Sequence, residues 1–487
     1  MRRRQMARQQ RGRAGGASAR DTQLPLPTSG LFVDARDARV SGMYAAVLEN
    51  FRTDGISMEL RKAFVLGPAD ELVLQRVPFA FGENPRYIDL RSFQAECNGA
   101  IFPRVFTGAA QVAYLSSQAV IADGLDLPVT YNGTTFQNSL FTTVTGVQPQ
   151  DFDGILAHHD RLYFWKTDGR LEFYYGDVGA VMGALVRFPL DRLGNITGGI
   201  AAMISLTMDI GQNSNDALAI FTTTGEIVIY EGLNPGDSTD WNLTTRIKVA
   251  PPLTRFGTTR VGGDVWMMTR VGIVSIMDTL RNGVLALVSA FTRPISDDVL
   301  QLVSIYPNAE WQLHTTADGS QIIINFYTTY LQKQFIWQVD SKSWSTADYP
   351  ARNWHNLVLA SEFTIGSGQR GTISDNPEST ELITAIWHSS WFDIGGEATV
   401  AYIRPTIKAK GALTIKVAVL SNHDDTPLDI IEAEQTVTIE ADNPPAPGGR
   451  VALNEVIGIG VQGRSFQLRM ELTASWAKIV KMEVGIA

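Results

Sequence analysis

A short phrase recurs along the middle of the chain: an apolar run, a polar turn that holds Thr and Gly, and a second apolar run. It occupies residues 161–175, 216–230 and 264–276, with a looser copy at 356–373. The apolar runs are β-branched or aromatic, and Gly169, Gly225 and Gly272 can supply the positive φ of a tight hairpin turn. The copies lie roughly 45–60 residues apart, the span of a four-stranded blade plus its loops. The repeat therefore predicts a β-propeller.

Composition is compatible with one large and one small domain in a chain of 487 residues. Hydrophobic residues make up 44% and charged residues 19%, and no stretch approaches the ~18 uninterrupted apolar residues of a membrane span. We therefore expect no membrane insertion. Cys97 is the one cysteine, which excludes a disulfide framework and a thiolate metal site, and we expect it to be buried as a small apolar residue.

The first twenty residues form a basic arm without an acidic residue. The net charge of the chain is −9, so the part beyond this arm carries −16. No apolar segment follows the arginines, which argues against a secretory signal, whereas a mitochondrial presequence is harder to dismiss. The arm is either a solvated tail or a segment that orders on an acidic protein surface or on nucleic-acid phosphates. Its candidate partner-binding residues are Arg2, Arg3, Arg4, Arg8, Arg11, Arg13 and Arg20.

The pattern divides the chain into four segments. After the arm (1–24), residues 25–66 read as an extended Pro/Gly stretch and a short helix that Ser41 caps, with Met43, Ala46, Val47 and Phe51 near one face. Alternating strands then predict a propeller over 57–385, in which 231–257 reads mostly as surface connection. Seven short strands over 386–487 predict a C-terminal β-sandwich. The predicted fold class is thus all-β.

No catalytic, cofactor-binding or metal-binding residue is predicted. His158 and His159 adjoin Asp160, but neighbours on a strand point to opposite faces and cannot readily chelate one ion. The histidines at 314, 355, 388 and 423 are isolated, and no GxGxxG or P-loop is present.

Six tryptophans recur along the blades, and we expect blade-to-blade packing rather than sugar stacking for Trp165, Trp241, Trp266, Trp311, Trp337 and Trp344. Trp387 and Trp391 flank the predicted domain boundary.

The order of motifs between Asp216 and Ile276 carries a more specific signal. GEIVIYEG, NPGDSTDW and PLTRFGTTRVGGDVWMMTRVGIVSI follow one another in a way that resembles the tail hub, or nozzle, proteins of short-tailed bacteriophages, also called packaged-DNA stabilisation proteins. EWQLHTTADGSQIIINFYTTYLQKQFIWQVDSKSWS (310–345) looks like the next blade of that family, and PLPTSGLFVDARDARVSGMYAAVLENFRTDG (25–55) is similar to its opening segment. The resemblance covers residues 25–375.

This resemblance implies a non-enzymatic structural protein of the virion tail, made in the host bacterial cytoplasm. It implies a homohexameric ring below the portal and the head-to-tail adaptor, which contacts distal needle or fibre proteins, continues the DNA channel without sequence recognition and helps to retain packaged DNA. The alternative is a glycan-binding or glycan-cleaving propeller at the virion surface. A third class, a regulatory interaction propeller in a cell, would behave as a monomer.

Overall fold

The computed structural model describes most of the chain and divides it into two compact units. The described residues are 20–32, 43–68, 72–80, 86–107, 109–190, 194, 196–209, 214–270, 272–282, 292–307, 309–356, 361–374, 381–422, 435–439, 450–454 and 456–487. One unit spans residues 62–379, and the other combines residues 1–61 with 380–487. The N-terminal segment thus belongs with the C-terminal strands, whereas the sequence placed it before the propeller as a segment of its own.

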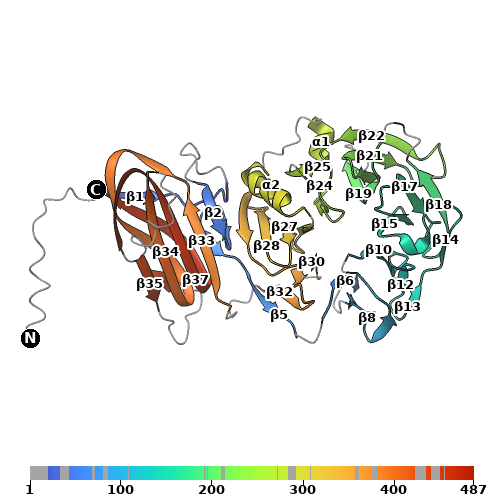
Figure 1. The fold of residues 1–487 in the computed structure, drawn as a ribbon, viewed down its shortest axis with the longest axis horizontal. Helices are drawn as coiled ribbons and strands as arrows, with labels where there is room; N and C mark the ends of the chain where they lie inside the picture. Colours follow the sequence, from blue (N-terminus) through green and yellow to red (C-terminus); the bar gives the residue numbers. More distant parts are fainter. Residues whose placement is uncertain are drawn as a thin grey trace, which may run out of the picture. The chain divides into compact units, whose positions relative to one another are not determined.

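The unit of residues 62–379 is a β-propeller. Its described strands include six sheets of four or five strands and one of three, β23-β24-β25. Figure 1 shows these sheets following one another around a ring. The first four sheets contain β6 (Gln75–Ala80), β7 (Arg86–Leu90), β8 (Gln94–Cys97), β9 (Ala100–Pro103); β10 (Gln111–Leu115), β11 (Gln118–Ala122), β12 (Val129–Tyr131), β13 (Phe136–Asn138); β14 (Phe141–Thr143), β15 (Gly154–His158), β16 (Arg161–Trp165), β17 (Glu172–Tyr175), β18 (Gly183–Pro189); β19 (Ile200–Asp209), β20 (Ser214–Thr222), β21 (Glu226–Glu231) and β22 (Asn242–Lys248).

The remaining sheets complete the ring. They contain β23 (Thr258–Val261), β24 (Asp264–Thr269), β25 (Gly272–Ser275); β26 (Glu310–Thr315), β27 (Gln321–Tyr327), β28 (Gln332–Gln338), β29 (Ser343–Ala347); and β30 (Asn353–Asn356), β31 (Ser361–Thr364), β32 (Arg370–Ser374) with β5 (Ala63–Leu66). In the last sheet β5 pairs antiparallel with β32, although some 300 residues separate them, with Val65 opposite Thr372. The start of the propeller chain therefore closes its last blade.

Hydrogen bonds between neighbouring sheets trace the inside of this ring. Each of these bonds joins the innermost strands of two neighbouring sheets. Where the bonded residue is not in the strand itself, it directly precedes it. The donor and acceptor residues are Gln75 with Ala110, Ile155 with Gln111, His158 with Ser205, Arg260 with Ser205, Thr259 with Thr315, Gln312 with Trp354, and Asn353 with Leu74. The series returns to its start, which confirms the predicted propeller.

The predicted hairpins are confirmed in all four copies of the repeat. β16 pairs with β17, β20 with β21, β24 with β25 and β31 with β32, each antiparallel. Gly169, Gly225 and Gly272 have φ of 94°, 89° and 129°. The continuous apolar runs follow from burial on both faces: Leu162 packs towards one neighbouring sheet, whereas Tyr163 packs towards the other. Each blade is thus sandwiched between two others.

Two details of this unit were not predicted. Residues 231–257 are mostly connection, as expected, but Asn242–Lys248 within them form β22, the outer strand of its blade. Its side chains are largely exposed, so the strand lacks the apolar alternation that would reveal it. The expected series of strands is also interrupted by two helices, α1 (Ile276–Asn282) and α2 (Ser296–Ile305). No helix in the described ranges is long and apolar enough to cross a bilayer.

The second unit is also built from strands, as predicted for the C-terminal residues. Hydrogen-bonded strands follow one another in the order β2-β33-β37-β34-β35. In addition, β1 and β4 pair with β37, β36 pairs with β34, and β3 pairs with β4. The seven short strands predicted over 386–487 are not found as such: β34 and β37 are 30 residues long each, bent (Figure 1) and paired with each other. The strands are β1 (Arg20–Leu24), β2 (Ala45–Glu49), β3 (Phe51–Thr53), β4 (Met58–Leu60), β33 (Ile383–Ser389), β34 (Phe392–Ser421), β35 (Gln435–Ile439), β36 (Arg450–Leu453) and β37 (Ile457–Ile486).

The predicted N-terminal helix is wrong for the part that the structure describes. Ala45–Glu49 form β2, which pairs antiparallel with β33, and Ser41 lies outside the described residues. The pairing shifts register between Ala45 and Val47, so the extra residue of a bulge separates the buried Ala45 from the buried Leu48 by three positions. The predicted helical face was Met43, Ala46, Val47 and Phe51, but Met43 is exposed and Ala46 and Val47 are only partly buried, so the helical spacing of these apolar residues does not follow burial.

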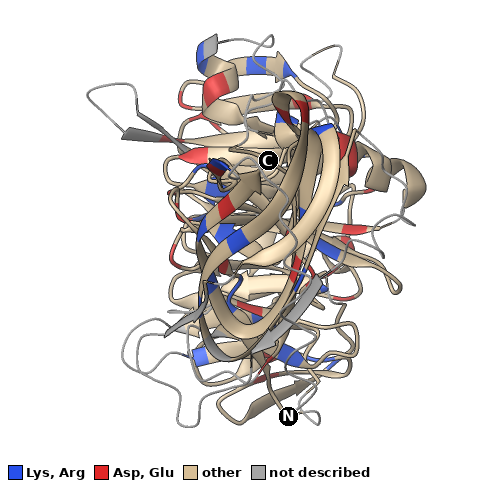
Figure 2. Ribbon diagram, turned by 90° about the vertical axis from the view of Figure 1, so that its left-hand side faces the viewer, with Lys and Arg blue, Asp and Glu red and all other residues tan. Residues whose placement is uncertain are grey.

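Charges on the second unit are mixed in sign. Figure 2 shows Lys and Arg interspersed with Asp and Glu along its strands. Several are paired across strands: Lys416 Nζ lies 3.0 Å from Glu471 Oε1, and Arg404 Nη1 lies 3.6 Å from Glu483 Oε2. The Lys416–Glu471 pair is exposed, so it contributes little to stability.

Candidate functional site

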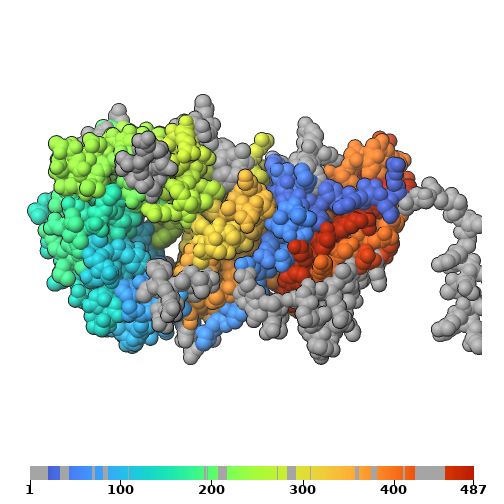
Figure 3. All heavy atoms as spheres, turned by 180° about the vertical axis from the view of Figure 1, so that it is seen from behind, coloured from blue at the N-terminus to red at the C-terminus, as the bar shows by residue number. Residues whose placement is uncertain are grey.

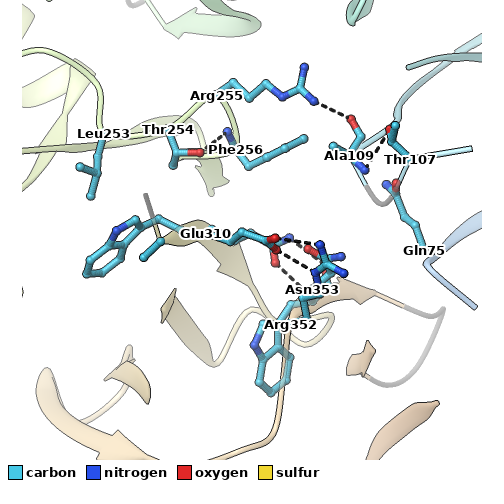
Figure 4. A pocket seen from close by; sticks show the side chains of 14 residues that line it. Gln75, Thr107, Ala109, Leu253, Thr254, Arg255, Phe256, Glu310, Arg352 and Asn353 are labelled. Carbon is cyan, nitrogen blue, oxygen red and sulfur yellow. Dashed lines mark hydrogen bonds and ion pairs between the residues drawn. The ribbon is translucent and has the colours of Figure 1, made fainter. Parts of the chain in front are cut away.

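A cavity of about 410 Å³ opens inside the propeller, and we call it the central cavity. Figure 3 shows the ring of blades hollowed near its middle, and Figure 4 shows the cavity at close range. Its walls come from the first residues of three inner strands, β6, β26 and β30, and from the connections that precede β10 and β23. The lining residues are Gln75, Thr107, Ala109, 253–256, 309–312 and 352–354.

The propeller ring explains why these residues meet. Inner strands run side by side around the axis, so their first residues converge although they are far apart in sequence. Gln312 of β26 donates from Nε2 to the Trp354 carbonyl at 2.8 Å and accepts from the Trp354 N–H at 2.7 Å. These two bonds join β26 to β30 at the cavity wall. Gln75 donates to the Ala110 carbonyl at 3.0 Å and so fixes the wall on the β6 side.

The charged groups of the central cavity are paired. Arg352 donates to both carboxylate oxygens of Glu310, from Nε at 2.9 Å and from Nη2 at 2.8 Å. This fork raises the pKa of Arg352 above its ordinary value. Arg255 Nη1 lies 3.0 Å from Asp153 Oδ2, and Arg255 Nη2 donates to the Ala109 carbonyl at 3.2 Å. Each guanidinium therefore has its own carboxylate, and the site carries no net charge.

Several hydrogen-bonding groups of the cavity keep unused capacity. Gln75 Oε1 is buried and has no partner in the described structure. Thr107 and Thr254 accept from nearby backbone N–H groups at 3.4 Å and 3.3 Å, which leaves each hydroxyl proton to be donated. Phe256 supplies an aromatic wall, with the Arg255 guanidinium 4.9 Å from its ring centroid. The cavity can thus offer donors, acceptors and an apolar face together.

His158 ends β15, and His159 lies in the turn that follows it. His158 is buried and its Nδ1 lies 2.9 Å from Ser205 Oγ, where it helps to join two blades. Burial lowers the pKa of His158 to about 4. His159 and Asp160 have φ of 46° and 55° and form the turn of the β15–β16 hairpin. Among the residues that the structure describes, no three His, Cys, Asp or Glu side chains gather as metal ligands would.

Two more of the histidines named above, His314 and His355, also serve the blades, whereas His388 lies in β33 of the second unit. His314 Nε2 lies 3.0 Å from Asn356 Oδ1, and burial lowers the pKa of His314 to about 3. His355 Nε2 lies 2.9 Å from Glu362 Oε2, in a network that also brings Arg76 and Arg370 to Glu362. This network connects β6, β30, β31 and β32 at the closure of the ring. His423 lies outside the described residues.

Most of the predicted tryptophans pack in cores, as expected. Trp165, Trp241, Trp311 and Trp344 are buried in the propeller, and Trp387 and Trp391 are buried in the second unit. Trp266 and Trp337 are only partly buried. Cys97 is buried, as predicted.

The arm cannot be assembled into a site from the structure. Arg20 is exposed and begins β1, where it stands opposite Ile486 of β37. The other candidates, Arg2, Arg3, Arg4, Arg8, Arg11 and Arg13, lie outside the described residues. The structure instead identifies the central cavity, whose Gln75, Glu310 and Arg352 the sequence analysis did not single out. The available signal was position: each stands at or beside the start of an inner strand.

No family model matches the chain, and no curated protein matches it. Among solved structures, the WD40 propeller domain of Doa1 is similar with 10% identity and a TM-score of 0.38, covering 65% of this chain and 96% of that one. The propeller domain of Cps50 (Swd1) from Myceliophteria thermophila gives 10% identity and a TM-score of 0.37, covering 61% of this chain and 99% of that one. A protein from Lactobacillus plantarum is similar with 11% identity and a TM-score of 0.33, covering 65% of this chain and 92% of that one.

Proposed function

We propose that this chain is a structural protein of a short-tailed phage tail. In this proposal it is a subunit of a six-fold hub ring below the portal and adaptor, which continues the DNA channel and helps to retain the genome. The motif order over 216–276 suggested this role, and an exposed apolar surface on one blade is the structural observation that supports it.

That surface, the blade-edge patch, consists of Leu140, Val144, Met182 and Val186. β14 adds to β18 as a fifth strand, with Phe141 opposite Gly183 and Thr143 opposite Leu185. This register sets Leu140 beside Met182 and Val144 beside Val186. The exposed fractions of Leu140, Val144, Met182 and Val186 are 64%, 93%, 46% and 50%. Their neighbours Phe141 and Leu185 face the core instead.

An exposed apolar patch of this kind is typical of a protein that binds another. β14 is also the edge of its sheet, and edge strands are common places for subunit contacts. In a ring of identical subunits, the patch would meet a different surface of the next copy, and such heterologous contacts close when the rotation returns to its start. We assign the patch to this subunit contact.

Charge fits the same proposal. The chain beyond the arm is strongly acidic, and acidic groups that face the lumen would repel DNA and let it slide without sequence recognition during ejection. The basic arm would dock on an acidic surface of the adaptor or of a neighbouring subunit. The protein would then reside in the virion tail and carry out no catalysis.

The test is the mass of the full chain by light scattering, alone and with the candidate adaptor, followed by ring counting in negative-stain images. We expect hexamers, formed alone or on the adaptor. The double variant Val144→Asp and Val186→Asp should prevent ring formation. Leu125→Asp, at an exposed position in a turn, is the control and should assemble normally.

A stable monomer that ignores the adaptor would contradict the proposal and favour the glycan alternative. Rings that form equally well with the double variant would remove the blade-edge patch from the interface.

A further inference from the structure

We propose that the central cavity binds a neutral saccharide of one or two rings, independently of assembly into a tail. The cavity volume of about 410 Å³ lies within the range of small-molecule sites, roughly 300–1,000 Å³. The site is lined by polar side chains at one side and by Phe256, Leu253 and Trp311 at another. This mixture matches the two faces of a sugar, which carries hydroxyl groups at its rim and C–H groups on its ring.

The charge balance selects a neutral ligand. Arg352 is paired with Glu310 through two bonds, and Arg255 is paired with Asp153. An anion would have to compete with these carboxylates, and it would lie beside Glu310, whose side chain remains 49% exposed. A neutral ligand avoids that repulsion, whereas the paired groups still offer hydrogen bonds.

The unused hydrogen-bonding capacity selects a ligand that both donates and accepts. Gln75 Oε1 has no partner among the described residues and is closed to solvent, so a ligand hydroxyl reaches it only when the Gln75 amide turns; leaving the atom unsatisfied is unfavourable. The hydroxyls of Thr107 and Thr254 can donate. A sugar hydroxyl is donor and acceptor at once, so a single ligand can satisfy the amide oxygen and use the threonine protons.

The aromatic wall orients the ligand. Phe256 is held by the backbone, since its N–H donates to Thr254 Oγ1 at 3.3 Å and its carbonyl accepts from the Leu313 N–H at 3.0 Å. The Arg255 guanidinium covers part of the ring. A flat apolar surface beside a set of planar polar groups favours the C–H face of a pyranose. Acyclic polyols have no such face, so they should bind more weakly.

The experiment uses the full chain and saturation-transfer NMR with titration. The probes are glucose, galactose, N-acetylglucosamine and lactose as neutral sugars, with glucuronate and inorganic phosphate as anions and sorbitol as the acyclic polyol. We expect at least one neutral sugar to bind and the anions and sorbitol to bind more weakly. Gln75→Ala should weaken sugar binding by roughly five- to tenfold, the worth of about one hydrogen bond. Gln137→Ala, on an exposed outer strand, is the matched control and should not change it.

A second variant tests the charge argument separately. Glu310→Gln keeps the shape of the side chain but leaves Arg352 without its carboxylate, so the variant should bind glucuronate or phosphate better than the natural chain does. Circular dichroism and thermal unfolding show whether each variant is folded. The proposal is overturned if no neutral sugar binds the folded chain, if an anion binds it better than every sugar, or if Gln75→Ala and Gln137→Ala bind equally.

This result does not depend on the tail proposal. A chain that forms rings but binds no sugar would overturn only the ligand assignment, and a monomer that binds a sugar would overturn only the hub.

Discussion

Gly169 and Gly225 occupy the same place in two copies of the repeat, but their surroundings differ. Both have positive φ, which a side chain with Cβ disfavours. A Cβ on Gly169 would meet no atom within 4 Å, whereas a Cβ on Gly225 would lie 2.2 Å from the Val249 carbonyl oxygen. The turn at Gly225 is therefore packed against the chain that follows β22, since the Val249 N–H also donates to the Gly225 carbonyl at 2.8 Å.

Alanine substitution should separate these two effects. Gly169→Ala should lower the free energy of unfolding by about 1–2 kcal/mol, the cost of a left-handed backbone. Gly225→Ala should lower the free energy of unfolding by roughly 1–3 kcal/mol more than Gly169→Ala does, because of the clash with Val249. Urea denaturation of both variants and of the natural chain measures the difference. Equal losses would show that the Val249 backbone moves away without cost.

At the scale of elements, closure of the ring depends on the short strand β5. Gly67 donates its N–H to the Arg370 carbonyl at 2.8 Å, and hydrogen-bonded pairs alternate along antiparallel strands. Val65, opposite Thr372, is therefore a hydrogen-bonded position with an exposed side chain. Phe64 packs beside Tyr349 and Phe363, with ring centroids 6.1 Å and 5.3 Å apart.

A proline at position 65 should open this closure without disturbing the core. Val65→Pro removes the backbone N–H, and we expect a lower midpoint of thermal unfolding and faster proteolysis near residues 62–66. Val65→Thr keeps the N–H and the β-branched shape, and it is the control. A Val65→Pro chain with the natural midpoint would mean that β5 contributes little to the ring.

The same elements show how far the sequence could predict the fold. The hairpins were predictable because blades buried on both faces give continuous apolar runs, and because Gly169, Gly225 and Gly272 mark the turns. β22 was missed since an exposed outer strand carries no apolar pattern. β2 was misread because Met43, Ala46, Val47 and Phe51 recur at helical intervals although the chain is extended there. The central cavity could not be predicted, because it joins side chains whose only common feature is their place at the axis.

At the scale of the whole molecule, buried histidines join neighbouring blades and make stability depend on pH. Burial lowers the pKa of His158 to about 4 and that of His314 to about 3. In the unfolded chain both titrate near 6.5. As the pH falls below about 6.5, these histidines become protonated in the unfolded state but stay neutral in the folded state. Their contribution to the free energy of unfolding is therefore fully present above this pH and is lost towards pH 4.

We expect each imidazole to reduce the free energy of unfolding by up to about 1.4 kcal/mol per pH unit in this window. Urea denaturation at a series of pH values between 7 and about 4 measures the slope. His314→Gln should remove one of the two contributions and flatten the curve. A stability that stays constant over this range would show that the folded chain accepts these protons.

The largest charge asymmetry of the molecule lies between the basic arm and the rest of the chain, which carries −16. Arg20 belongs to β1 and should be kept, so the test changes only Arg2, Arg3, Arg4, Arg8, Arg11 and Arg13. Replacing these six with Gln should weaken assembly on the adaptor, because it removes the charge that would attract an acidic surface.

Replacement with Lys keeps the charge and should preserve assembly at low ionic strength, with the attraction fading as added salt screens it. Light scattering of each full-length variant with the adaptor measures both effects. If the Gln variant assembles as the natural chain does, the arm is a solvated tail; if the Lys variant fails as well, the arm acts through the geometry of the guanidinium fork rather than through charge alone.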